Sequence, residues 1–294
     1  MTALDTVLVA GSLHYDILVE ADHLPRRDET AVGRRWYPKF GGKGGNQAVA
    51  VARAGVRARM LGAVGADDFG RHLRAGLQAG GVDDRFVATL PGVGSGMSVA
   101  ILDAAGDYAA TIVSGANLAV PTGPILDAAL WAGVGLVVLQ NEVPEALNLA
   151  VARQARARGI RTLLNAAPAR ELSPDLAALI DVLVVNAVEA EMMGAAEVRG
   201  LDAAAEAAER LAGRFDCVVV TAGGEGLAAW TAKEKRLILP AEKVDVVSTH
   251  GAGDAFIGTL AANLLRGVAF AECCRRASKA AALHVAGKTA PVVG

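Results

Sequence analysis

The stretch Gly135–Asn165, which reads GLVVLQNEVPEALNLAVARQARARGIRTLLN, decides the fold class. It contains a continuously apolar run over Gly135–Leu139, an Ala-rich segment with helical spacing over Glu145–Arg158, and a second apolar run over Arg161–Asn165. Strands that are covered by helices on both faces have such continuous apolar sequences. Strand, helix and strand in this order predict two parallel strands joined by a right-handed crossover.

The same alternation extends over most of the chain. Other apolar runs predict strands at Thr6–Ala10, Arg59–Val64, Val182–Asn186 and Cys217–Thr221, and helical spacing predicts helices at Gln47–Ala54, Phe69–Ala79, Asp202–Ala212 and Ala255–Leu265. A further strand is expected at Lys243–Val247, before the last of these helices. Residues 13–40 and 96–114 differ, because they contain shorter alternating runs typical of antiparallel strands, at Ala31–Trp36, Ser98–Leu102 and Tyr108–Val113. The expected fold is α/β, with a central mostly parallel sheet flanked by helices and a small antiparallel β lid. We expect residues 1–294 to form a single domain.

The composition excludes several classes of protein. The chain has 294 residues with 29 Lys and Arg against 31 Asp and Glu, so no excess positive charge is present for a nucleic-acid partner. The uncharged apolar run Ala128–Leu139 is too short to span a membrane. Cys217, Cys273 and Cys274 form no C-x-x-C pair, and no secretory signal is apparent. We therefore expect a cytoplasmic protein with buried thiols.

The glycine-rich stretch Gly41–Gln47, GGKGGNQ, runs directly into a predicted helix. Glycines let the backbone approach a ligand closely, and the start of a helix supplies free N–H groups. Lys43 and Asn46 add donors for hydroxyl or phosphate groups. The spacing is not that of a P-loop, and a glycine hinge between lid and core is the structural alternative.

Two further glycine-rich turns lie later in the chain. In Ser248–Asp254, STHGAGD, the N–H groups of residues 251–253 at a helix start can form an anion hole. Asp254 is placed to accept a proton from a substrate hydroxyl, although a carboxylate that only stabilises the positive helix end fits this motif equally well. Thr221–Gly226, TAGGEG, follows a strand at the edge where open α/β sheets bind ligands, and a tight strand–strand connection explains it equally well.

Together these motifs resemble the ribokinase-like (phosphofructokinase-B type) family of carbohydrate kinases. The motifs lie in the family's order along nearly the whole chain: Gly11-Ser12 with Asp16, Gly41–Ala48, Gly65–Gly70, Gly115–Asn117, Asn165–Ala169, Asn186–Glu189 and Gly251–Asp254. The stretch Asn165–Ala169 is similar to the ribokinase version in particular. The class of dinucleotide-dependent oxidoreductases is excluded, because the chain lacks G-x-G-x-x-G after its first strand.

The resemblance implies transfer of the γ-phosphate of Mg-ATP to a hydroxymethyl group of a sugar, with D-ribose as the leading acceptor. It makes Asp254 the general base and the anion hole the backbone of Gly251, Ala252 and Gly253. It implies sugar contacts from His14, Asp16, Gly42, Lys43, Asn46, Glu142 and Asp254. It implies nucleotide contacts from Asn186, Thr221, Gly223, Gly226, Gly253 and Ser278. Glu189 and Asn186 would act around Mg²⁺ through water, because Mg²⁺ usually keeps several waters.

Two positions depart from the family pattern. His14 stands where ribokinases usually carry Asn, which changes the hydroxyl groups that fit and leaves another pentose, a hexose or a nucleoside as alternative acceptors. Ser248 stands where many members carry the Asp of a monovalent-cation site near His250, and loss of that carboxylate removes the strongest oxygen ligand. We therefore expect no activation by K⁺, and we expect no catalytic role for His250.

The resemblance also bears on partners and on catalysis itself. It implies that the lid strands form the interface of a homodimer. A non-catalytic sugar or nucleotide sensor is the second hypothesis, and the presence of Asp254, Lys43 and Glu189 argues against it.

Overall fold

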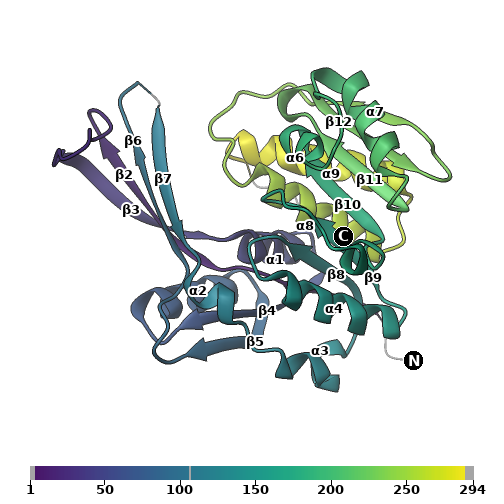
Figure 1. Ribbon diagram of the computed structural model, residues 1–294, viewed down its shortest axis with the longest axis horizontal. Coiled ribbons are helices and arrows are strands. Elements are labelled where there is room, and N and C mark those ends of the chain that lie inside the picture. Colours follow the sequence, from purple (N-terminus) through teal and green to yellow (C-terminus); the bar gives the residue numbers. More distant parts are fainter. Residues whose placement is uncertain (1–3, 106, 289–294) are drawn as a thin grey trace.

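The computed structural model describes residues 4–105 and 107–288, and these form two sheets (Figure 1). The larger sheet has nine strands in the order β13-β12-β11-β10-β9-β8-β1-β4-β5. All neighbours from β5 to β11 are parallel, whereas β12 and β13 are antiparallel additions. The strands are β1 (Thr6–Ala10), β4 (Arg57–Gly65), β5 (Val82–Leu90), β8 (Val134–Gln140), β9 (Arg161–Asn165), β10 (Val182–Asn186), β11 (Cys217–Thr221), β12 (Gly226–Thr231) and β13 (Leu237–Pro240).

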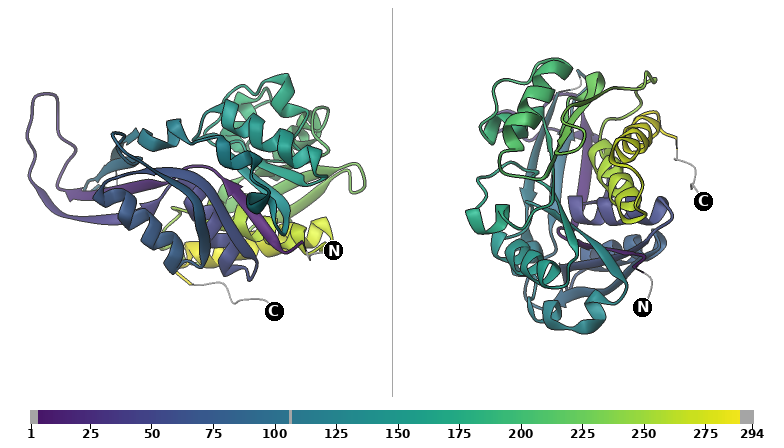
Figure 2. Two further views of the ribbon diagram at one scale, coloured as in Figure 1. Left: turned by 90° about the horizontal axis from the view of Figure 1, so that it is seen from below. Right: turned by 90° about the vertical axis from the view of Figure 1, so that its right-hand side faces the viewer.

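Helices cover both faces of this sheet (Figure 2, right). One face carries α1 (Lys43–Arg53), α2 (Asp68–Ala79), α8 (Ala252–Leu265) and α9 (Phe270–Val285). The other carries α3 (Ala128–Trp131), α4 (Glu145–Ala157), α5 (Pro174–Ala177), α6 (Ala187–Met192) and α7 (Gly200–Leu211). In β1, Val7 and Val9 join one core while Leu8 and Ala10 join the other. This alternation explains why the parallel strands are apolar at every position.

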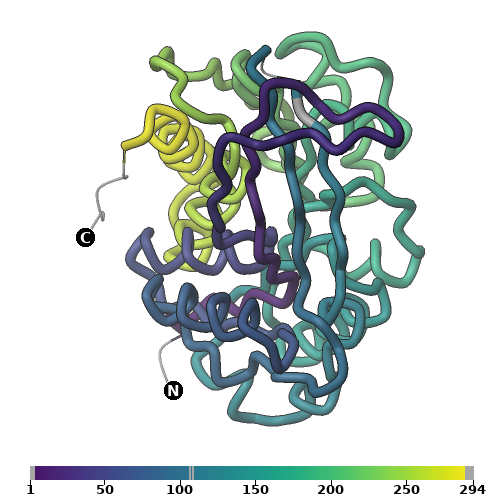
Figure 3. Tube along the Cα trace, turned by 90° about the vertical axis from the view of Figure 1, so that its left-hand side faces the viewer, coloured from purple at the N-terminus to yellow at the C-terminus, as the bar shows by residue number. Residues whose placement is uncertain are grey.

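The second sheet has the order β3-β2-β6-β7 and projects from the larger one (Figures 1 and 2, left). Its strands are β2 (His14–Ala21), β3 (Gly33–Gly41), β6 (Met97–Leu102) and β7 (Tyr108–Val113). The outer pairs are antiparallel, as predicted, and the central pair of β2 and β6 is parallel. In Figure 3 the strands of the second sheet lie on the side of the molecule that faces the viewer.

Two contacts fix the base of the second sheet. The ring of Tyr15 stacks on Phe69 of α2, with 4.1 Å between ring centroids. Buried Asn117 accepts a hydrogen bond from the Leu13 N–H and donates one to the Leu13 carbonyl, each 2.9 Å long. Since Leu13 lies between β1 and β2, the motif Gly115–Asn117 fixes where the chain passes from the larger sheet to the second sheet.

The predicted strand at Lys243–Val247 is wrong. This segment follows β13 without strand geometry, and its apolar side chains Val246 and Val247 are 66% and 74% exposed. An alternating pattern produces a strand only where the segment pairs with a neighbouring strand, and Lys243–Val247 pairs with no strand of the described residues. The predictions also omitted β2, β5, β12 and β13.

Among the helices of the described ranges, none is both long and apolar enough to cross a membrane.

The three cysteines are buried and unpaired. Burial raises the pKa of the Cys217 thiol to about 12 and that of Cys273 to about 11. The expectation of buried thiols is confirmed.

Candidate active site

Polar side chains collect where the parallel strands end. Along the carboxyl edge of the sheet, Thr221 ends β11, Asn186 ends β10 and Asn165 ends β9. Glu142 follows β8 and Ser12 follows β1, so the row continues toward the second sheet. This is the edge where open α/β sheets bind their ligands.

The glycine-rich turn brings α1 against this edge. Gly42 has φ +85° and precedes the first turn of α1. A Cβ on Gly44 would lie only 2.6 Å from the backbone nitrogen of Ser12, so a larger residue would push the helix away. Glu142 Oε2 accepts hydrogen bonds from the Lys43 N–H (2.9 Å) and from the Ser12 hydroxyl. These glycines thus serve helix packing, and the Lys43 side chain is left at the edge of the site, half-buried.

Asp254 lies in the first turn of α8, directly above this edge. The helix begins at Ala252 after Gly251, whose φ of +81° is in the left-handed region that favours glycine. The Asp254 carboxylate accepts hydrogen bonds from Gln47 Nε2 (2.9 Å) and Asn46 Nδ2 (3.2 Å). Burial raises the pKa of Asp254, and the charge of Lys43 together with these two amides opposes the rise.

Gln47 is a site residue that the sequence reasoning missed. It is fully buried, and its Nε2 donates both to Asp254 and to Asn165 Oδ1 (3.1 Å). It therefore joins α1, α8 and the end of β9. Its spacing in the sequence could have predicted this role, because Gln47 lies four residues after Lys43 and thus on the same face of the helix.

The second sheet adds polar groups from the other side. Asp16 on β2 pairs in register with Lys39 on β3, and its Oδ1 accepts a hydrogen bond from Ser98 (2.5 Å). Burial lowers the pKa of Lys39, and the Asp16 charge opposes this. His14 is only 4% exposed; its Nδ1 lies 3.9 Å from Glu142 Oε2, and its Nε2 has no hydrogen-bond partner.

The residues that the family resemblance implies for binding the nucleotide and Mg²⁺ also make hydrogen bonds that stabilise the fold. Asn186 and Glu189 form a capping box at the start of α6, with the Glu189 N–H bonded to Asn186 Oδ1 (2.8 Å) and the Asn186 N–H bonded to Glu189 Oε2 (2.9 Å). Burial raises the pKa of Glu189, opposed by this bond and by the charge of Lys43. The Thr221 hydroxyl donates to the Val185 carbonyl over 3.4 Å.

The remaining predicted positions are less closely joined to this cluster. Gly223 opens a short 3₁₀ turn between β11 and β12, and Gly226 has φ +124°. A Cβ on Gly226 would lie 2.2 Å from the Leu239 carbonyl oxygen, so the tight strand–strand connection requires glycine here. Ser278 is half-buried on α9, and Ser248 and His250 are exposed in the loop before α8.

Comparison with known proteins identifies the family. The sequence model for pfkB family carbohydrate kinases matches residues 4–290. The chain belongs to the pfkB family of carbohydrate kinases. It is a ribokinase-like kinase, as the motifs predicted.

Individual relatives of this pfkB kinase agree with that assignment. It is 30% identical to the ribokinase of Haemophilus influenzae over 97% of this chain and 94% of the relative. It is 32% identical to the deoxyribokinase of Salmonella typhi over 96% of this chain and 93% of the relative. The structure of Arabidopsis thaliana ribokinase complexed with ribose and ATP superposes with a TM-score of 0.90 at 28% identity, covering 99% of this chain and 95% of the other.

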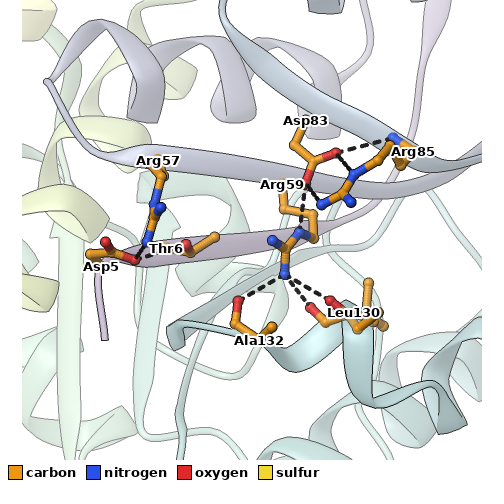
Figure 4. A network of polar contacts seen from close by, with 9 residues as sticks. Asp5, Thr6, Arg57, Arg59, Asp83, Arg85, Leu130 and Ala132 are labelled. Carbon is orange, nitrogen blue, oxygen red and sulfur yellow. Dashed lines mark hydrogen bonds and ion pairs between the residues drawn. The ribbon is translucent and has the colours of Figure 1, made fainter. Parts of the chain in front are cut away.

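A cavity of about 550 Å³ lies at the opposite, amino-terminal edge of the sheet of this kinase. Its charged residues form two separate groups of ion pairs (Figure 4): Arg57 pairs with Asp5, and Asp83 pairs with both Arg59 and Arg85. Arg59 also donates to three backbone carbonyls at and beside α3. Because these charges already have partners, we interpret the residues around the cavity as structural: one pair joins the start of β1 to β4, and the other group joins β4 to β5.

Proposed function

We propose that this kinase transfers the γ-phosphate of Mg-ATP to a hydroxymethyl group of a sugar, with Asp254 as the general base. The observation that carries this proposal is the Asp254 carboxylate, held by Gln47 and Asn46 in the first turn of α8. Amides that donate to a carboxylate stabilise its charged form, which is the form that accepts a proton.

The same helix start supports the second half of the chemistry. The N–H groups of Gly251, Ala252 and Gly253 lie at or before the first turn of α8, where backbone donors stabilise negative charge. In the transition state the phosphoryl group carries its charge on three equatorial oxygens, and fixed donors stabilise it there. The base and the anion hole are thus carried by one helix start.

The row of strand ends suggests how the two substrates divide the site. We assign the sugar to the end near the second sheet, which carries Asp16, Glu142, His14, Lys43 and Asn46. Gly42 shapes the same turn. A carboxylate such as Asp16 accepts strong hydrogen bonds from hydroxyl groups. We assign the nucleotide to the ends of β10 and β11 and the turn after them, with Asn186, Thr221, Gly223, Gly226 and Ser278.

The donor set fits a Mg²⁺ ion that arrives with the nucleotide. The described part of the chain has no group of three or more His, Cys, Asp or Glu side chains placed to hold a metal. Mg²⁺ is commonly bound by one or two carboxylates with phosphates and water. Glu189 has one carboxylate oxygen outside its capping bond, and Asn186 lies beside it. When bound, the ion would neutralise charge on the phosphates.

D-ribose is the acceptor that we propose. Ribokinase relatives and the Arabidopsis ribokinase support it, and the deoxyribokinase relative shows that a similar level of identity accompanies another pentose. His14 favours testing these alternatives, because a buried ring nitrogen without a partner lies within the proposed sugar site. Hexoses and nucleosides belong in the same test.

The deciding experiment measures ADP release from Mg-ATP with D-ribose, 2-deoxyribose, hexoses and nucleosides, each against a no-acceptor control. Turnover that depends on ribose supports the proposal, and turnover with another acceptor alone replaces ribose by that compound. If nothing is phosphorylated while calorimetry detects binding of sugar or nucleotide, the second candidate, a sensor, replaces the kinase.

We also propose that the second sheet forms a homodimer interface. Val19 pairs with Trp36 and Ile101, and Ile17 pairs with Val99, so one face of the sheet is apolar over three strands. Trp36 is 64% exposed. Sedimentation of the wild type and of Trp36→Glu tests this, since only the wild type should dimerise.

The organisation of residues 1–294 as a single domain and the cytoplasmic location of the protein remain predictions.

A further inference from the structure

A histidine from α9 holds the loop that precedes the anion-hole helix. His284 lies in the last turn of α9, and its Nε2 is 2.9 Å from the carbonyl oxygen of His250. A carbonyl oxygen only accepts hydrogen bonds, so His284 must carry its hydrogen on Nε2. This bond joins two segments 34 residues apart in the sequence.

The imidazole of His284 also packs against the first residue of the anion hole. A Cβ on Gly251 would lie 3.0 Å from His284 Nε2, so the ring lies directly beside the Gly251 backbone. The N–H groups of Val247 and Ser248 donate to the Val285 carbonyl over 2.9 and 3.2 Å. The end of α9 therefore fixes the loop 247–251 at three backbone positions.

The residues of this loop do not fit the alkali-metal site that the family resemblance suggests. Ser248 supplies no carboxylate, and its hydroxyl already accepts a hydrogen bond from the His250 N–H over 3.3 Å. The His250 carbonyl, a natural cation ligand, already uses one of its two lone pairs in the hydrogen bond from His284. Burial lowers the pKa of His250, and the positive charges of Lys39 and Lys43 lower it further, opposed by Asp16. A monovalent cation bound at this loop would have weak ligands and positively charged neighbours.

We propose that the N–H of His284 replaces a monovalent cation as the group that positions the anion-hole loop. His284 is a positioning residue, because it acts through the His250 carbonyl and Gly251 and not on the substrates. The inference rests on the proposed phosphoryl transfer. It predicts that the wild-type kinase works equally well in K⁺ and in a bulky organic cation.

The test compares His284→Leu, which removes the donor, with His284→Gln, whose amide can restore one. Lys279→Leu is the matched control, since Lys279 is an exposed cation on the same helix. Initial rates are measured with the best acceptor in potassium chloride and in N-methylglucamine chloride at equal ionic strength. For the wild type, the rates in the two salts should differ by less than about twofold, and the same should hold for Lys279→Leu. Because a tenfold change in rate corresponds to 1.36 kcal/mol, this difference is negligible.

We expect His284→Leu to lower kcat by about 10- to 100-fold, with the sugar KM little changed, because misplaced donors act mainly on the transition state. His284→Gln should recover most of this loss. Activation of the wild type by K⁺ would overturn the proposal, and so would a His284→Leu variant with wild-type kcat.

A readout without turnover separates this inference from the proposed function. Hydrogen–deuterium exchange at the amides of residues 247–253 should accelerate in His284→Leu and stay slow in His284→Gln and Lys279→Leu. Unchanged exchange in His284→Leu would overturn the positioning role even if the protein is an active kinase. Faster exchange in a protein that phosphorylates nothing would support the loop contact while the proposed function fails.

Discussion

The contact between Gln47 and Asp254 makes a specific prediction about the pH dependence of the rate. Gln47 is fully buried, and its Nε2 lies 2.9 Å from Asp254 Oδ1. Replacement by Met keeps the length of the side chain and its burial but removes the donor. After Gln47→Met the carboxylate keeps only the longer bond from Asn46 (3.2 Å) and the charge of Lys43.

The sign and size of the effect follow from this contact. Burial raises the pKa of Asp254 and the Gln47 bond opposes that rise, so removing the bond raises the pKa further. A hydrogen bond to a charged group contributes about 1.5–3 kcal/mol, and one pKa unit corresponds to 1.36 kcal/mol. The acidic limb of the kcat profile should therefore move upward by about 1 to 2 pH units. Protonated Asp254 cannot act as a base, so the loss of rate is confined to the acidic side.

The assay is kcat against pH for the wild type and Gln47→Met at saturating sugar and ATP. Asn263→Leu is the control, because Asn263 is a buried amide on the same helix as Asp254 that bonds instead to Thr259 and Arg276. It should lose stability and keep the wild-type profile. An unshifted acidic limb in Gln47→Met, or an equal fall of kcat at every pH, would refute the reasoning.

Four further changes test the site and the fold. Asp254→Asn should lower kcat by about 10²- to 10⁴-fold while calorimetric ATP binding persists, and near-wild-type turnover would remove Asp254 as the base. Asp16→Asn should raise the sugar KM by about tenfold without changing the ATP KM, since a charge-assisted hydrogen bond is weakened; an equal rise in both would place Asp16 elsewhere. Gly258→Val should destabilise by at least about 1–3 kcal/mol in urea unfolding, because a Cβ at Gly258 already lies 2.4 Å from that of Ala50 where α8 crosses α1, and full stability would show that the helices separate freely. Arg59→Met should cost about 3–5 kcal/mol, because it breaks a largely buried ion pair and leaves carbonyls beside α3 without a donor; a loss below about 1 kcal/mol would contradict the network in Figure 4.

The sequence alone determined the fold class and the family. Continuously apolar runs such as Val182–Asn186 identified strands buried on both faces, because that pattern depends only on local burial. The expectation of a strand failed at Lys243–Val247, whose residues pair with no strand of either sheet. The glycine motifs also placed Asp254 correctly at the start of a helix.

Only the tertiary structure decided which side chains meet. Gln47 and Asp254 are 207 residues apart, and no local pattern shows that their side chains hydrogen-bond. Gly44 is explained by the backbone of Ser12 against which it packs, and His284 by the His250 carbonyl to which it donates. Periodicity in a sequence reports how each residue is covered. The partners of a polar group depend on how strands and helices from distant parts of the chain are brought together, which is a property of the whole fold.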